Sequence, residues 1–104
     1  MLLLELGKIM KKEMLLSKLG TLKSELVKKY KINNLALFGS YARNQQQDKS
    51  DIDLIVFSDY KNYFQLIEME NYISEKLDKK IDLGYYDSLK SYVKKTIEND
   101  IIYV

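Results

Sequence analysis

The chain of 104 residues contains no cysteine, no histidine and no proline. Without cysteine there is no disulfide, no thiolate metal site and no cysteine nucleophile. Without histidine there is no Ser-His-Asp triad, no histidine metal ligand and no imidazole acid or base. Any catalysis must therefore use carboxylates, lysines, hydroxyl groups or a metal ion bound by oxygen ligands.

Long apolar runs are also missing, since none approaches the roughly 20 residues that a membrane span requires. The first residues, MLLLELGKIMKK, lack the basic start and the cleavage site of a secretory signal, so we expect a cytoplasmic protein. The net charge is only +2, from 17 basic and 15 acidic residues. A typical nucleic-acid-binding domain is far more basic, so we expect no direct nucleic-acid partner.

No repeat, linker or change of composition divides the chain, which predicts a single domain over residues 1–104, with residues 1–14 as an extra N-terminal segment. A leucine stripe predicts a helix that starts near Ser17 or Thr21, because Gly20 interrupts the pattern. Later segments predict, in order, a strand, a second strand, a helix, a third strand and a helix capped by Ser88: residues 33–38, 51–57, 61–80, 80–86 and 88–97.

The second and third strands are joined by a long helix, which favours a parallel pair with a right-handed crossover. The fold class is therefore α/β or α+β, with a small sheet of three or four strands and helices on one side. The last four residues, IIYV, close the chain.

Two acids interrupt the apolar second strand. Side chains two positions apart on a strand share a face and lie roughly 6.6–7 Å apart, so Asp51 and Asp53 point one way, while Ile52 and Leu54 point toward the core. Two carboxylates this close repel each other. A divalent cation between them would reverse that penalty.

Asp82 repeats the pattern in the third strand, between Ile81 and Leu83. Neighbouring strands lie about 4.8 Å apart, so Asp82 can reach the same patch. Hard oxygen ligands favour Mg²⁺ or Mn²⁺, and three carboxylates on one sheet face make a two-metal site reasonable. A calcium loop is disfavoured, because Ile52 stands where that loop needs an oxygen ligand, which leaves Asp48 as a loop residue.

The segment Gly39-Ser40 follows the first strand directly, where a chain needs positive φ or a close approach of the backbone. Ser40 offers a hydroxyl and an amide at the start of a helical turn, which is a common anion site. Arg43 is the single arginine among 17 cations. Its planar guanidinium can bind phosphate oxygens in pairs, which a lysine cannot do.

The chain carries a pattern that resembles the polymerase-β-type nucleotidyltransferase superfamily. The pattern consists of Gly39, Ser40, ten further residues and then Asp51-Ile52-Asp53. The segment LFGSYARNQQQDKSDIDLIV resembles more closely the minimal nucleotidyltransferases, the MNT antitoxins that are paired with HEPN ribonuclease toxins. The resemblance covers roughly residues 17–104. Asn44 departs from it, because relatives usually carry glycine after the arginine.

The resemblance implies a polymerase-β-like nucleotidyltransferase fold and an enzyme that transfers AMP from ATP to a tyrosine hydroxyl of a HEPN toxin, which it neutralises. It assigns the metals, two Mg²⁺ or Mn²⁺ ions, to Asp51, Asp53 and Asp82, and gives Asp82 a further part in deprotonating the acceptor. It assigns the triphosphate to Gly39 and Ser40, and a phosphate contact to Arg43. It also implies a hetero-oligomer with the toxin or a homodimer.

Two other functions stay open: an inactive antitoxin that blocks its toxin by contact, and a nucleotidyltransferase acting on a small molecule or RNA. Two further site assignments are weaker. Ser50 is either a cap at the start of the second strand or a minor phosphate contact, and we favour the cap. Several tyrosines could serve as modification sites or base platforms, but we expect them to pack in the core or an interface: Tyr41, Tyr60, Tyr63, Tyr85 and Tyr86.

Overall fold

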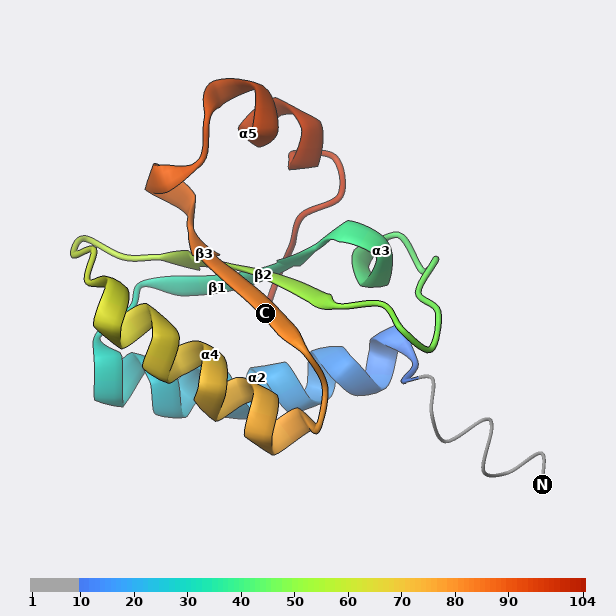
Figure 1. The fold of residues 1–104 in the computed structure, drawn as a ribbon, viewed down its shortest axis with the longest axis horizontal. Helices are drawn as coiled ribbons and strands as arrows, with labels where there is room; N and C mark the ends of the chain where they lie inside the picture. Colours follow the sequence, from blue (N-terminus) through green and yellow to red (C-terminus); the bar gives the residue numbers. More distant parts are fainter. Residues whose placement is uncertain (1–9) are drawn as a thin grey trace.

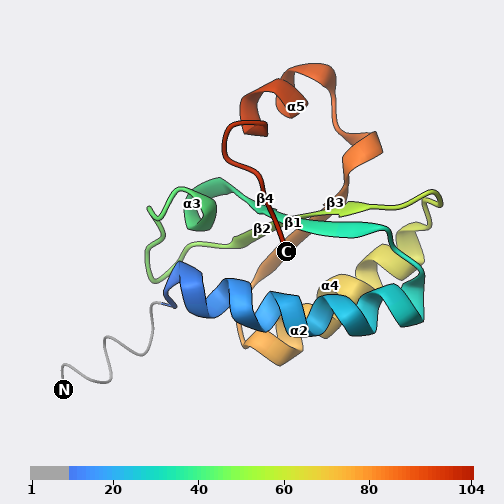
Figure 2. The ribbon, with the colours of Figure 1, turned by 180° about the vertical axis from the view of Figure 1, so that it is seen from behind.

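A computed structural model describes residues 10–104 of the chain, so residues 1–9 of the expected N-terminal segment lie outside the described residues. A mixed four-stranded sheet separates two long helices from a short one (Figure 1, Figure 2). None of the helices in this part of the chain combines the length and hydropathy needed to cross a membrane. The elements are α2 (Lys12–Tyr30), β1 (Asn34–Phe38), α3 (Gly39–Ala42), β2 (Ile52–Phe57), α4 (Tyr63–Leu77), β3 (Ile81–Tyr85), the 3₁₀ turn η1 (Tyr86–Ser88), α5 (Ser91–Ile97) and β4 (Ile102–Tyr103).

The strands lie in the order β3-β2-β1-β4. The β2 and β3 strands run parallel, which confirms the prediction from the long helix between them. The β1 strand is antiparallel to both of its neighbours, β2 and β4. The chain end, IIYV, therefore supplies a fourth strand and pairs with the strand that leads into Gly39.

The helix α2 begins at Lys12, so the predicted start near Ser17 or Thr21 is wrong. A Cβ built on Gly20 would meet nothing within 4 Å, so this glycine faces open space and the helix continues through it. The buried side chains on the opposite face hold the helix to the sheet, because burying a leucine contributes roughly 1.5–3 kcal/mol, more than the cost of one glycine. They are Leu15, Leu19, Leu22, Leu26 and Tyr30.

The helix α4 covers the same face of the sheet as α2 (Figure 1). Asn62 caps its start, because the Asn62 side chain accepts hydrogen bonds from the amides of Phe64 and Gln65. The helix ends at Leu77, three residues before the end of the predicted segment 61–80, and Asp78 follows it with φ of 52°. The predicted stripe is confirmed, since Met69, Ile73 and Leu77 are buried and Leu66 packs partly against the core.

The short helix α5 lies on the other side of the sheet, so the expectation that all helices share one side is wrong (Figure 1, Figure 2). Ser88 does not cap it either. Ser88 closes η1, the extended residue Leu89 follows, and α5 begins only at Ser91. Ile97 of α5 is buried, and Tyr86 stacks on Phe57 at a centroid distance of 4.8 Å, so apolar contacts form on this side too.

Candidate active site

Gly39 and Asp53 touch where β1 passes into α3. Phe38 and Asp53 are paired residues of β1 and β2, so the next residue, Gly39, turns directly over the Asp53 side chain. Gly39 has φ of 77°, and a Cβ added to it would overlap Asp53 Oδ2 and lie 3.0 Å from Asp53 Cγ. Both reasons for expecting a glycine at this position, positive φ and close backbone approach, are therefore confirmed.

Asp53 and Asp82 face each other across the parallel strands β2 and β3, as paired residues of the register. The residues that flank each acid are buried in the core beneath the helices, which places the two acids on the opposite face of the sheet. They are Ile52 and Leu54 beside Asp53, and Ile81 and Leu83 beside Asp82. Asp82 is exposed and Asp53 is half-buried. The sheet thus brings together two acids that are 29 positions apart in the sequence, as the period of the two strands predicted.

Asp51 stands immediately before β2 and is also half-buried. Its carboxylate lies 3.9 Å from the ammonium group of Lys80, at the corresponding position before β3. Lys80 is 82% exposed in this pair, so the contact adds little to stability. Asp51 therefore remains available to a ligand at this end of the sheet.

The pKa of Asp53 is raised above the ordinary aspartate value. Burial is the largest cause, the charges of Asp82 and Asp51 add to it, and the positive charge of Arg43 acts in the opposite direction. The negative charge of the three carboxylates is thus only partly balanced by the positive charge of Arg43. A cation bound among these carboxylates would lower the pKa of Asp53 again, because it stabilises the ionised form.

The donor set fits a hard divalent cation in its chemistry, and Asp53 and Asp82 share one face of the sheet. Carboxylate oxygens are the ligands that Mg²⁺ and Mn²⁺ prefer. Within residues 10–104, however, no three acidic side chains are drawn together closely enough to form a metal site. Asp53 and Asp82 face each other with Asp51 beside them, so a bound cation would be held by carboxylates that already repel one another.

Ser40 lies in the four-residue helix α3, directly after Gly39. Its hydroxyl has no hydrogen-bond partner among the described residues, while its carbonyl accepts a bond of 2.8 Å from the amide of Gln45. The amides at the start of any helix lack intrahelical acceptors. Ser40 therefore presents polar groups without protein partners next to the Gly39–Asp53 contact.

Arg43 follows α3 and has two side-chain partners. Its Nε donates to Gln45 Oε1 at 3.1 Å, and its Nη1 forms an ion pair of 3.1 Å with Asp100 Oδ2. Asp100 lies 57 positions away, and nothing in the sequence pattern pointed to it. Arg43 lies near enough to Asp53 for its charge to act on that carboxylate, and the structure adds an acid, Asp100, that no motif in the sequence indicates.

The loop between α3 and β2 is closed by its own residues. Asn44 has φ of 59°, a conformation that asparagine tolerates better than most residues and that would equally suit the glycine expected from the resemblance. The Ser50 hydroxyl accepts a bond of 2.8 Å from the amide of Gln47, and the Ser50 amide donates to the Gln47 carbonyl at 3.0 Å. These contacts favour a cap at the start of β2 over a phosphate contact. Asp48 is an exposed loop residue, as expected.

The five tyrosines singled out in the sequence divide into two groups. Tyr41 and Tyr85 are buried, and Tyr86 packs against an aromatic neighbour, so the expectation of packing is confirmed for these three. Tyr60 and Tyr63 are 75% and 61% exposed, so they do not belong to the core.

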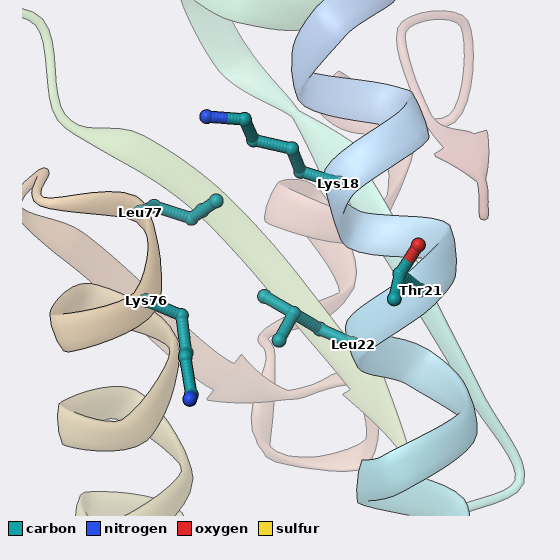
Figure 3. Close-up of a pocket in the computed structure, with 5 residues that line it drawn as sticks. All are labelled: Lys18, Thr21, Leu22, Lys76 and Leu77. Atoms are coloured by element: carbon teal, nitrogen blue, oxygen red, sulfur yellow. The ribbon is translucent and has the colours of Figure 1, made fainter.

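A hollow of about 290 Å³ lies between α2 and α4 (Figure 3). It is lined by Lys18, Thr21, Leu22, Lys76 and Leu77. Both helices cover the sheet face opposite Asp53 and Asp82. The hollow is therefore separate from the candidate active site.

The profile of the nucleotidyltransferase domain family matches residues 19–104. A relative from Methanocaldococcus jannaschii, named provisionally as a protein adenylyltransferase, is 48% identical over 84 residues, which cover 79% of this chain and 86% of the relative. The protein adenylyltransferase MntA of Thermococcus cleftensis is 34% identical over 83 residues, which cover 79% of this chain and 84% of that protein.

Two solved structures share the fold, each with a TM-score of 0.66. One is a toxin–antitoxin with AMP-PNP, 24% identical, in which the match covers 76% of this chain and 66% of that chain. The other is a tri-AMPylated HEPN toxin of Shewanella oneidensis in complex with an MNT antitoxin, 20% identical, with 88% of this chain and 70% of that chain covered. The predicted polymerase-β-like architecture is thereby confirmed. With its Gly39–Asp53 contact, its paired acids on one sheet face and this family match, the chain belongs to the nucleotidyltransferase domain family, among relatives named protein adenylyltransferases.

Proposed function

We propose that this chain is an antitoxin that transfers AMP from ATP to a tyrosine hydroxyl of a partner HEPN toxin and thereby neutralises it. The observation that carries the proposal is the contact of Gly39 with Asp53, in register with Asp82, within a nucleotidyltransferase chain. The names of its relatives support protein as the acceptor and a HEPN toxin as the partner. Because ATP is the donor, the proposed reaction takes place in the cytoplasm.

The acceptor oxygen attacks the α-phosphorus of ATP, the bond from that phosphorus to the bridging oxygen breaks, and pyrophosphate leaves. The phenolic proton passes to a base, and we assign this role to Asp82; its exposed side chain on the same sheet face as Asp53 supports the assignment. A base near the acceptor matters because free tyrosine has a pKa of about 10. The products are the AMP–tyrosine ester and pyrophosphate, so atoms and charge balance.

Asp51, Asp53 and Asp82 would hold two Mg²⁺ ions, with Mn²⁺ as a substitute. When bound, such ions neutralise the charge on the phosphates and keep the attacking and leaving oxygens in line. The chain's own contribution is placement. Gly39 lets the backbone pass over Asp53 without a side chain, and Ser40 and Arg43 offer donors to the triphosphate beside it.

The chemistry suits a chain without histidine or cysteine. Phosphoryl transfer requires positioning and charge compensation more than a covalent role for a side chain. Carboxylates, a hydroxyl, backbone amides and one guanidinium supply both functions in this chain. The small net charge of +2 also favours a protein acceptor over RNA, whose binding depends on an excess of basic residues.

The double change Asp51→Ala with Asp53→Ala tests the proposal. The variant, the unchanged chain and a matched control are incubated with the purified partner toxin, Mg²⁺ and radioactive ATP. The control is Asp59→Ala with Asp87→Ala, which removes two exposed carboxylates outside the site. We expect label on the toxin from the unchanged chain and from the control, and at least about a hundredfold less from the site variant, since several kcal/mol of charge stabilisation is lost.

The same variants separate the other functions. If the site variant still neutralises the toxin in cells, the chain acts by contact and the enzymatic proposal fails for this role. If label enters RNA and never protein, the chain is an RNA nucleotidyltransferase instead. Circular dichroism of the site variant confirms that the fold is kept.

A further inference from the structure

The guanidinium of Arg43 is held on two sides. Its Nε is bonded to Gln45 within the same loop, and its Nη1 to Asp100 near the end of the chain. Arginine has five N–H donors, so these two bonds leave three of them. Nη2 donates no hydrogen bond to any of the described residues, so the outer edge of the guanidinium still offers donors to a ligand.

Asp100 is itself fixed by the backbone around it. The amides of Asp100 and Ile101 both donate to the carbonyl of Ile97 at 2.9 Å, which closes the turn after α5. Ile97 is buried, and the strand β4 that follows pairs with β1. The β1 strand leads directly into Gly39, so Asp100 and the turn at Gly39-Ser40 are anchored to the same strand.

We propose that Asp100 is a positioning residue for ATP binding, which holds Arg43 in place so that its free Nη2 edge meets the triphosphate. This inference rests on the proposed function of Arg43. A free arginine side chain loses rotamer entropy when it is fixed by a ligand. An arginine that Asp100 and Gln45 have already oriented gives up less, so the triphosphate binds more tightly.

The ion pair is suited to orienting the side chain without blocking it. Asp100 occupies one donor of Nη1 and leaves its second hydrogen and both of those on Nη2. The side chains of Arg43 and Asp100 are 44% and 26% exposed, so a phosphate has access to this pair. Asp100 therefore acts through Arg43 and need not touch the nucleotide.

Calorimetric titration with Mg²⁺ and AMP-PNP tests the inference without any turnover. Asp100→Asn removes the charge with little change of shape, and Glu98→Gln is the matched control, an exposed acid two residues away with no partner among the described contacts. We expect Asp100→Asn to weaken AMP-PNP binding about threefold to fivefold, the range of a partly exposed ion pair, and Glu98→Gln to leave it unchanged. Tripolyphosphate should show the same ratio, because the lost contact is to phosphate.

A double-mutant cycle shows whether Asp100 acts through Arg43. Arg43→Gln alone should weaken AMP-PNP binding more than Asp100→Asn does, and adding Asp100→Asn to Arg43→Gln should then change nothing further. A purely structural role of Asp100 would lower the melting temperature without this pattern. Asp100→Ala gives the same readout if the asparagine disturbs the turn.

Three outcomes would overturn the inference alone: unchanged or tighter binding by Asp100→Asn, an equal loss in the Arg43→Gln background, or a loss with AMP-PNP that tripolyphosphate does not share. If Arg43→Gln binds AMP-PNP as well as the unchanged chain, the phosphate contact of Arg43 in the proposed function is wrong. The inference then falls with it. If the unchanged chain itself does not bind AMP-PNP, the proposed function fails first.

Discussion

Replacing Gly39 by alanine should strongly destabilise this protein, for two independent reasons. A residue with a side chain at φ of 77° carries backbone strain, which costs about 1–2 kcal/mol. The new Cβ would also overlap Asp53 Oδ2 and lie 3.0 Å from Asp53 Cγ, and relieving such an overlap costs about 1–3 kcal/mol. Together the two effects predict a loss of about 2–5 kcal/mol, out of a typical total of roughly 5–15 kcal/mol.

The chain supplies its own control for this change. Gly20 lies in the middle of α2, and a Cβ there meets nothing within 4 Å. Gly20→Ala should therefore stabilise the protein by about 1 kcal/mol. In thermal unfolding followed by circular dichroism, a loss of about 2–5 kcal/mol corresponds to a melting temperature lower by about 8–40 °C, and the control should rise by roughly 4–8 °C.

A cycle with Asp53→Ala separates the two effects. Without the carboxylate, the new Cβ at residue 39 keeps only a tight contact of 3.1 Å with the Cβ of residue 53, so Gly39→Ala should cost about 1–2 kcal/mol, close to the strain alone. Equal costs in both backgrounds would show that Asp53 does not lie against Gly39. A melting temperature of Gly39→Ala equal to that of the unchanged chain would refute both the strain and the overlap.

Two further predictions concern charge and capping. Asp53→Asn should make the metal-free protein more stable at pH 7, because the raised pKa of Asp53 means that its ionised form disfavours the fold. This gain in stability should shrink as the pH falls toward the unfolded-state pKa of about 4. Urea unfolding between about pH 4 and 8 measures the trend, and the opposite trend would contradict burial and charge repulsion as the cause. Asn62→Ala should cost about 1 kcal/mol in the same urea assay, because it removes the two hydrogen bonds that cap α4, and an unchanged midpoint would argue against the cap.

Most of the site could be predicted because its parts are local in the sequence. A period of two along a strand places Asp53 opposite Ile52 and Leu54, whatever the rest of the fold does. A glycine and serine directly after a strand predict a tight turn with unpaired amides. These rules depend on backbone geometry alone, and the structure confirms the turn at Gly39 and the shared face of Asp53 and Asp82.

The wrong predictions lie where packing outweighs local preference. Helix propensity alone predicts that α2 starts only near or after Gly20. Gly20 lies on the open face of the helix, however, and its unfavourable propensity is small compared with the stabilisation from the buried leucines. Residue type alone favours Ser88 as a helix cap, whereas Tyr86 stacks on Phe57 and fixes a 3₁₀ turn there. In both cases the deciding contact is with another element, which a local pattern does not contain.

Residue types and their spacing along the chain were enough to predict the chemistry of this protein: which acids, hydroxyls and cation are present, which of them share a strand face, and which reactions are closed to a chain without histidine and cysteine. The contact of Asp53 with Gly39 and the ion pair of Asp100 with Arg43 became visible only in the folded chain. Residue type and strand period are fixed along the chain, while contacts between distant segments exist only once the sheet has paired β4 with β1 and β2 with β3.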